Sequence, residues 1–107
     1  MARPHLSSNE ITSLRPLGAQ LRQTESHALL KSQQLEVLRI VLPAGKTRPR
    51  HAVPGDITLQ CLEGSAEFVA EGQRQRMQAQ DFVYLTGGAP HEITALTDCS
   101  LLVTIRL

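Results

Sequence analysis

The sequence predicts an all-β fold, an antiparallel sandwich or barrel made of short strands. Three observations support this prediction. Turn signals recur about every 8 to 12 residues from Gly45 onward. Short apolar runs lie between the turns, and little of the chain has helical spacing. The last run, residues 101–107, places Leu, Val, Ile and Leu on one face and Leu, Thr and Arg on the other, which is typical of a strand.

The composition is that of one ordinary globular domain. The chain has 107 residues, 41% of them apolar and 20% charged, and its net charge is +1. A charge so close to zero gives no general attraction to nucleic acid or to an anionic membrane. With 3% aromatic residues and no Trp, the chain also lacks base-stacking platforms. We therefore expect no nucleic-acid partner and no membrane partner.

Two further features bear on where the protein works. The N-terminus has no apolar segment of the secretory type, so the cytoplasm is the expected location. Cys61 and Cys99 have no metal-type spacing, and in a reducing compartment both are expected to be buried thiols.

Residues 1–25 are expected to form a polar lead-in, and residues 26–107 the β domain. Ser7 followed by Glu10 has the spacing of a helix capping box. A short N-terminal helix could therefore run to Leu14 before Pro16 stops it, and an extended lead-in is the other possibility.

Residues 37–42 form the first apolar run of the domain, and both of its faces are largely apolar. Its β-branched content and the stop at 43–45 favour a strand over a helix. A strand of this kind must be covered on both sides, either by the N-terminal segment or by a second subunit. The latter leads us to expect a homodimer.

The remaining runs are short and are separated by turns. They cover residues 57–62, 66–70, 82–85, 91–95 and 101–107. Lys46, Arg48 and Arg50 precede His51. These basic residues either steer a carboxylate or phosphate toward a pocket or belong to a solvated loop.

Two glycines and a histidine make up the first of two recognisable motifs. Gly45 is followed by five residues and then by His51, and Gly64 closes the same segment. This arrangement resembles the first motif of the cupin superfamily.

The second motif begins 15 residues after the first one ends. It contains Gln80 and Asp81, then Gly88, two further residues and His91. The resemblance covers about residues 28–107 and is closest to small single-domain cupins of the RmlC-like type. It implies a double-stranded β-helix, or jelly-roll barrel, that is commonly dimeric.

The departures from these motifs concern the metal ligands. Cupin metal centres usually take three histidines and a glutamate, but Val53 and Ile57 occupy two of the four places. In the second motif, Gln80, Thr86 and Ala95 stand where Gly, Pro and Asn are usual.

Only His51 and His91 therefore remain as metal ligands carried over from the family. If a divalent metal such as Zn, Ni, Fe or Mn is bound, it needs further donors. The other interpretation is that the protein binds no functional metal. Asp56 is one residue away from the expected glutamate, so in a regular strand its side chain points to the opposite face unless a bulge follows Gly55. Cys61 is another possible donor.

Alternation along the strand after the first turn predicts a largely apolar pocket with two polar points. The expected lining residues are His51, Val53, Ile57, Leu59, Cys61 and His91. The first functional interpretation is a cupin that binds a small organic ligand there without a full metal centre. The alternative is a minimal metal-dependent or histidine-catalysed enzyme of the isomerase or oxygenase type, in which Tyr84 could act as a general acid.

Overall fold

The protein is described by a computed structural model, in which residues 5–107 are placed. The first four residues of the expected lead-in lie outside the described residues. One short 3-10 helix precedes nine strands in that range. They are η1 (Gly18–Gln23), β1 (His27–Lys31), β2 (Leu35–Leu42), β3 (Thr47–His51), β4 (Ile57–Glu63), β5 (Ser65–Ala70), β6 (Gln73–Gln78), β7 (Phe82–Leu85), β8 (His91–Ala95) and β9 (Cys99–Arg106).

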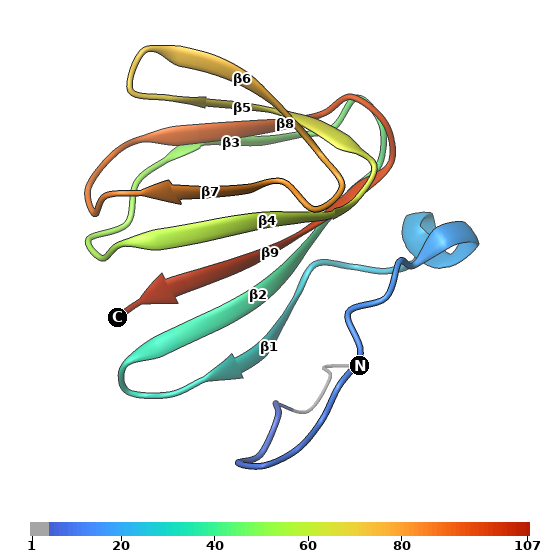
Figure 1. The fold of residues 1–107 in the computed structure, drawn as a ribbon, viewed down its shortest axis with the longest axis vertical. Helices are drawn as coiled ribbons and strands as arrows, with labels where there is room; N and C mark the ends of the chain where they lie inside the picture. The colour runs from blue at the N-terminus through green and yellow to red at the C-terminus, as the bar shows by residue number, and fades with distance from the viewer. Residues whose placement is uncertain (1–4) are drawn as a thin grey trace.

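The strands form two antiparallel sheets that face each other (Figure 1). One sheet has the order β1-β2-β9-β4-β7 and the other the order β3-β8-β5-β6. Strands far apart in sequence are neighbours, such as β2 with β9 and β3 with β8. The predicted all-β jelly roll is confirmed. No helix within residues 5–107 is long and apolar enough to cross a membrane.

The core lies between the sheets and is built from the inward positions of alternating strands. On β4, Ile57, Leu59 and Cys61 are buried at 3%, 1% and 0% exposure. Phe68 on β5 belongs to the same core cluster from the facing sheet, and Leu101 on β9 belongs to it from the sheet of β4. Burial of this apolar face, at about 25 cal/mol per Å², is the main force that holds the sheets together.

The hairpin between β5 and β6 shows how the predicted turns act. Glu71 and Gly72 are its two loop residues, and their φ angles are +50° and +76°. Two successive positive φ angles are those of a type I′ turn, whose twist matches that of the flanking strands. The Glu71-Gly72 turn signal in the sequence therefore marks a true hairpin.

The N-terminal helix is not where the sequence placed it. Ser7 N–H donates to Oε1 of Glu10 at 2.9 Å, so half of the capping box forms. However, Asn9 has a φ of +71°, which ends the turn after one step, and no helix continues to Leu14. The helix that does form, η1, begins after Pro16.

The N-terminal segment is attached to the outer face of the five-stranded sheet through a partly buried carboxylate. Both oxygens of Glu63, at the end of β4, accept from the Leu17 N–H at 2.9 Å. Oε2 also accepts from Ser100 Oγ at 2.6 Å and from the Arg39 guanidinium at 3.1 Å. The Arg39 guanidinium donates in turn to the carbonyl of Arg15 at 2.9 Å. The sequence predicted that either the N-terminal segment or a second subunit covers the outer face of β2. The N-terminal segment lies there.

Candidate functional site

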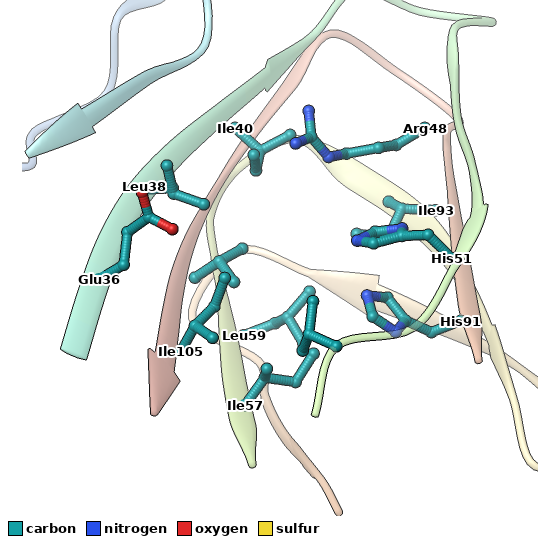
Figure 2. A pocket seen from close by; sticks show the side chains of 12 residues that line it. Glu36, Leu38, Ile40, Arg48, His51, Ile57, Leu59, His91, Ile93 and Ile105 are labelled. Atoms are coloured by element: carbon teal, nitrogen blue, oxygen red, sulfur yellow. The ribbon is translucent and has the colours of Figure 1, made fainter. Parts of the chain in front are cut away.

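A cavity of about 220 Å³ lies between the two sheets, near the start of β4 and the end of β9. Most of its wall is aliphatic, and the polar lining groups are few (Figure 2). Five strands and the loop after β3 contribute to it. The lining residues are Glu36, Leu38, Ile40, Arg48, His51, Val53, Ile57, Leu59, His91, Ile93, Val103 and Ile105.

The two motif histidines meet at this cavity. His51 and His91 are paired across β3 and β8, and the centroids of their rings are 4.4 Å apart. His91 is buried at 4% exposure, whereas His51 is exposed and lies at the opening. Two residues 40 positions apart in sequence are thus brought into one small site.

Hydrogen bonds fix the tautomer of both imidazoles. Nδ1 of His51 lies 3.2 Å from the carbonyl oxygen of Pro49, and Nδ1 of His91 lies 3.3 Å from that of Ala89. A carbonyl oxygen can only accept, so the proton of each neutral ring is on Nδ1. Each Nε2 is then left to interact with whatever enters the cavity.

The environment of His91 favours its neutral form. Burial lowers the pKa of His91, and the hydrogen bond to the Ala89 carbonyl opposes this effect. The nearby charges of His51 and Arg48 lower the pKa further. His91 is therefore uncharged at neutral pH, and Arg48 is the permanent positive charge of the site.

A β-bulge in β3 brings Arg48 to the cavity. Arg48 pairs with Ile93 and His51 with His91, so three steps along β3 match two steps along β8. In a regular strand, residues three apart point to opposite faces, but the extra residue returns both side chains to the inner face. Pro49 lies within this bulge, and β3 is an edge strand, the two settings in which a sheet tolerates proline.

Most of the expected lining residues are found at the cavity. The structure brings His51, Val53, Ile57, Leu59 and His91 together there. Cys61 is the exception. It has the expected inward direction, but the cavity ends at Leu59, and Cys61 is enclosed in the core at 0% exposure with its Sγ 3.4 Å from the Glu63 carbonyl.

Both cysteines are free and buried, as expected from their spacing. Burial raises the pKa of the Cys61 thiol and raises that of Cys99 to about 12. A thiol that does not ionise near neutral pH is a poor nucleophile and a poor metal ligand. Cys61 also lies outside the lining of the cavity, so it is not placed to serve as the additional donor.

Asp56 and Tyr84 are also directed away from the cavity. Tyr84 pairs with Thr58 on the outer face of the sheet and is 58% exposed. Its hydroxyl donates to Oδ2 of Asp56 at 3.2 Å, and Oδ1 of Asp56 accepts from the Gly87 N–H at 2.8 Å. A general acid for the histidine pair therefore does not come from Tyr84, and Asp56 does not replace the missing glutamate.

The residues at the cavity do not fit a cupin metal centre. Val53 and Ile57 bring aliphatic groups to the places of two ligands, and the guanidinium of Arg48 opposes a bound cation. Across residues 5–107, no group of three or more His, Cys, Asp and Glu side chains is arranged to hold a metal ion. Two imidazoles are one fewer than a catalytic zinc usually takes from its protein.

Sequence reasoning missed two polar lining residues, Arg48 and Glu36, and five aliphatic ones, Leu38, Ile40, Ile93, Val103 and Ile105. The sequence left Arg48 with two interpretations, steering of an anionic ligand or a place in a solvated loop. Pro49 could have indicated an edge strand with a bulge, because these are the settings in which a sheet tolerates proline. Glu36 shares its face of β2 with Leu38 and Ile40, so continuing the alternation by one step would have included it.

Comparisons with known proteins give a family and several similar folds. Residues 38–105 match the family model of the cupin domain. A conserved protein of unknown function from Streptococcus pyogenes has a TM-score of 0.76 at 22% identity, over 99% of this chain and 96% of that one. An RmlC-like cupin from Desulfovibrio desulfuricans has a TM-score of 0.73 at 24% identity, over 95% and 97%. A cupin superfamily protein from Desulfitobacterium hafniense has a TM-score of 0.76 at 18% identity, over 91% and 94%. No curated protein matches the sequence.

Proposed function

The chain belongs to the cupin family, and we propose that it binds one small organic ligand in the cavity at His51 and His91. The observation that carries the proposal is the meeting of two imidazoles, 4.4 Å apart, with walls that are otherwise mainly aliphatic. Apolar cavities with a few convergent polar groups are typical of small-molecule sites, in which the polar groups fix the orientation of the ligand.

The size of the cavity limits the ligand to a small metabolite. A water molecule takes up about 30 Å³ in the liquid, so about 220 Å³ holds roughly seven groups of that size. Nucleotides and oligosaccharides are too large to be enclosed. A molecule of this size can contact the histidines and the opposite wall at the same time.

Binding rather than catalysis is the function that the site supports better. The alternative, a metal-dependent or histidine-catalysed enzyme, needs groups held around the reacting atoms. Here the third and fourth cupin ligands are replaced by aliphatic groups, and Tyr84 is on the outer face of the sheet. The same fold hosts many activities, so the side chains of the site, and not the fold, decide between the two.

A thermal-shift screen tests the proposal. A panel of small acids, amides, alcohols and sugars is added to the metal-free protein, and the melting temperature is recorded. A ligand at 100 times its Kd adds about 2.7 kcal/mol to the free energy of unfolding, a shift that such an assay resolves readily. A panel that shifts neither the melting temperature nor the histidine resonances in NMR spectra would contradict the proposal.

Two variants test whether the ligand binds in this cavity. Val53→Phe adds an aromatic ring at the half-buried loop that lines the cavity, so the ligand's stabilising effect should be lost. Val69→Phe is the matched control, because Val69 does not line the cavity but lines a neighbouring hollow, which shares His91 with it. It should leave the ligand shift unchanged. The opposite result would move the site to that hollow.

We also propose that the protein forms a homodimer. Phe82 and Tyr84 of the edge strand β7 are 64% and 58% exposed and point to the same outer face. Large exposed apolar side chains gathered on one sheet face are typical of interaction surfaces.

A further inference from the structure

The guanidinium of Arg48 is an unusual group to find at an apolar cavity. Arg48 is half-buried, and its side chain reaches over the cavity from the same wall as the two histidines (Figure 2). Within residues 5–107, the three ion pairs join Arg22 to Asp98, Arg39 to Glu63 and Arg74 to Glu67, so Arg48 has no carboxylate partner there. No hydrogen bond from this guanidinium to another side chain in that range is present either.

A partly desolvated positive charge without a counter-ion lowers the stability of the free protein. The backbone nevertheless departs from regular pairing in the way that points this side chain inward, because the bulge at Pro49 puts Arg48 and His51 on one face. A bulge that redirects a side chain is a feature often found beside functional sites. The arrangement is therefore best explained by a ligand that supplies the missing negative charge.

We infer that the ligand is a monocarboxylic acid with a short aliphatic body, whose carboxylate binds between Arg48 and the histidine pair. This inference rests on the proposed function and specifies its ligand class. A planar guanidinium matches a carboxylate with two parallel hydrogen bonds. Nε2 of His51 or His91 is available to a second polar atom on the same end of the molecule.

The opposite wall determines the remainder of the ligand. Leu38, Ile40, Leu59 and Val103 offer only aliphatic contacts, which favour a hydrocarbon body. Glu36 lies on the same wall, away from the histidines (Figure 2). Its carboxylate would repel a second negative charge, so a dicarboxylic acid of the same length is disfavoured. With room for roughly seven water-sized groups, the carboxylate and about four to six carbon atoms fill the cavity.

Isothermal titration calorimetry with matched probes tests this inference. The probes are 4-methylpentanoate, its neutral amide 4-methylpentanamide, the dicarboxylate adipate and inorganic phosphate. A hydrogen-bonded charge typically contributes enough to change affinity by about tenfold to a hundredfold. We expect the wild-type protein to bind the acid at least tenfold more tightly than the amide, adipate or phosphate.

Arg48→Gln should remove this preference. Its affinity for the acid should fall to about that of the amide, while its affinity for the amide stays unchanged. Arg50→Gln is the control: the position is on the same strand and the change in net charge is identical, but its side chain does not line the cavity. It should retain the wild-type preference, which separates the local effect of Arg48 from a general loss of positive charge.

The outcomes separate the inference from the proposed function. Equal binding of acid and amide, or an unchanged preference in Arg48→Gln, overturns the carboxylate assignment and leaves a neutral ligand in the same cavity. Phosphate binding as tight as that of the acid also overturns it, because the aliphatic body would then contribute nothing. If none of the four probes binds, the carboxylate class is rejected, and the thermal-shift screen decides separately whether the cavity binds other small molecules.

Discussion

Replacement of Glu63 by Gln should weaken the protein strongly, because this carboxylate joins the N-terminal segment to the barrel. Its two oxygens accept from the N–H groups of Leu17 and Gly18, from Ser100 Oγ and from the Arg39 guanidinium. The side chains of Glu63 and Arg39 are only 12% and 5% exposed. Gln has nearly the same shape, but it lacks the charge and turns one acceptor into a donor.

The expected loss can be estimated from the contacts. Removing one partner of a buried ion pair costs about 3 to 5 kcal/mol, because the other charge is left without compensation. The side-chain carbonyl of Gln still accepts part of the hydrogen bonds, so we expect about 3 kcal/mol. At about 4–8 °C per kcal/mol for a domain of this size, the melting temperature should fall by roughly 12–24 °C. A domain with a typical stability of about 5–15 kcal/mol stays folded at 25 °C after this loss.

The pH dependence of this effect follows from the pKa of Glu63. Burial raises the pKa, but the hydrogen bonds from Leu17, Ser100 and Gly18 and the charge of Arg39 lower it more, so the net pKa is below the usual value. A carboxyl with a lowered folded-state pKa stabilises the protein fully above its unfolded-state pKa, and this contribution is lost as the pH falls through the folded-state value. The difference between wild type and Glu63→Gln should therefore be complete at pH 7 and shrink below about pH 4.

Chemical denaturation at pH 7 and pH 3, combined with amide hydrogen exchange, measures this prediction. Glu67→Gln is the control, because Glu67 also pairs with an arginine but does so on the surface, where a pair contributes about 0–1 kcal/mol. In Glu63→Gln, the amide protons of Leu17 and Gly18 should exchange faster, since they lose their acceptor. If Glu63→Gln costs no more than Glu67→Gln, the carboxylate does not anchor the N-terminal segment and the reasoning is refuted.

Three further predictions concern the turn after β4, metal content and assembly. Gly64→Ala should lower the free energy of unfolding by about 3 kcal/mol or more, because a Cβ would lie 2.0 Å from the Asp98 carbonyl oxygen. The control is Gly72→Ala, which has nearly the same φ but open space, and it should lower the free energy by only about 1 kcal/mol. Thermal unfolding measures both. Elemental analysis of protein purified without added metal should find zinc, nickel, iron and manganese far below one ion per chain; a full equivalent that disappears in His51→Ala would contradict this. Light scattering coupled to size exclusion should give twice the chain mass at micromolar concentration, and a monomer that is indifferent to Phe82→Lys would argue against the dimer proposed at β7.

The strands that could be predicted from sequence are the five with two neighbours in a sheet and one edge strand, β7. The central strands β2, β4, β5, β8 and β9 have strong apolar patterns, because at least one of their faces is enclosed in the core. The strands that no apolar run marked are β1, β3 and β6, and all three are edge strands. An edge strand needs few inward apolar residues, and β6 has a single buried one, Met77. Periodicity therefore carries little information where a sheet ends.

The candidate site was predictable only in part, for a related reason. The motif spacing indicated that His51 and His91 would meet, and alternation placed Ile57 and Leu59 beside them. The extent of the cavity along β4 was not encoded in that alternation, so Cys61 was included although the core already closes around it. How far a pocket reaches depends on the side chains of the facing sheet, which a single strand's pattern does not contain.

The position of Arg48 connects the bulge to the chemistry of the cavity. In a regularly paired β3, Arg48 and His51 would lie on opposite faces, so only one of them could reach the interior. The bulge at Pro49 admits both, and it does so on an edge strand, where an irregular ladder leaves fewer backbone groups unpaired. With Val53 and Ile57 in place of two metal ligands and a guanidinium added nearby, the electrostatic preference of the site changes from a cation to an anion. On the assignment that we propose, the barrel frame that holds a metal in other cupins binds a small, negatively charged ligand in this one.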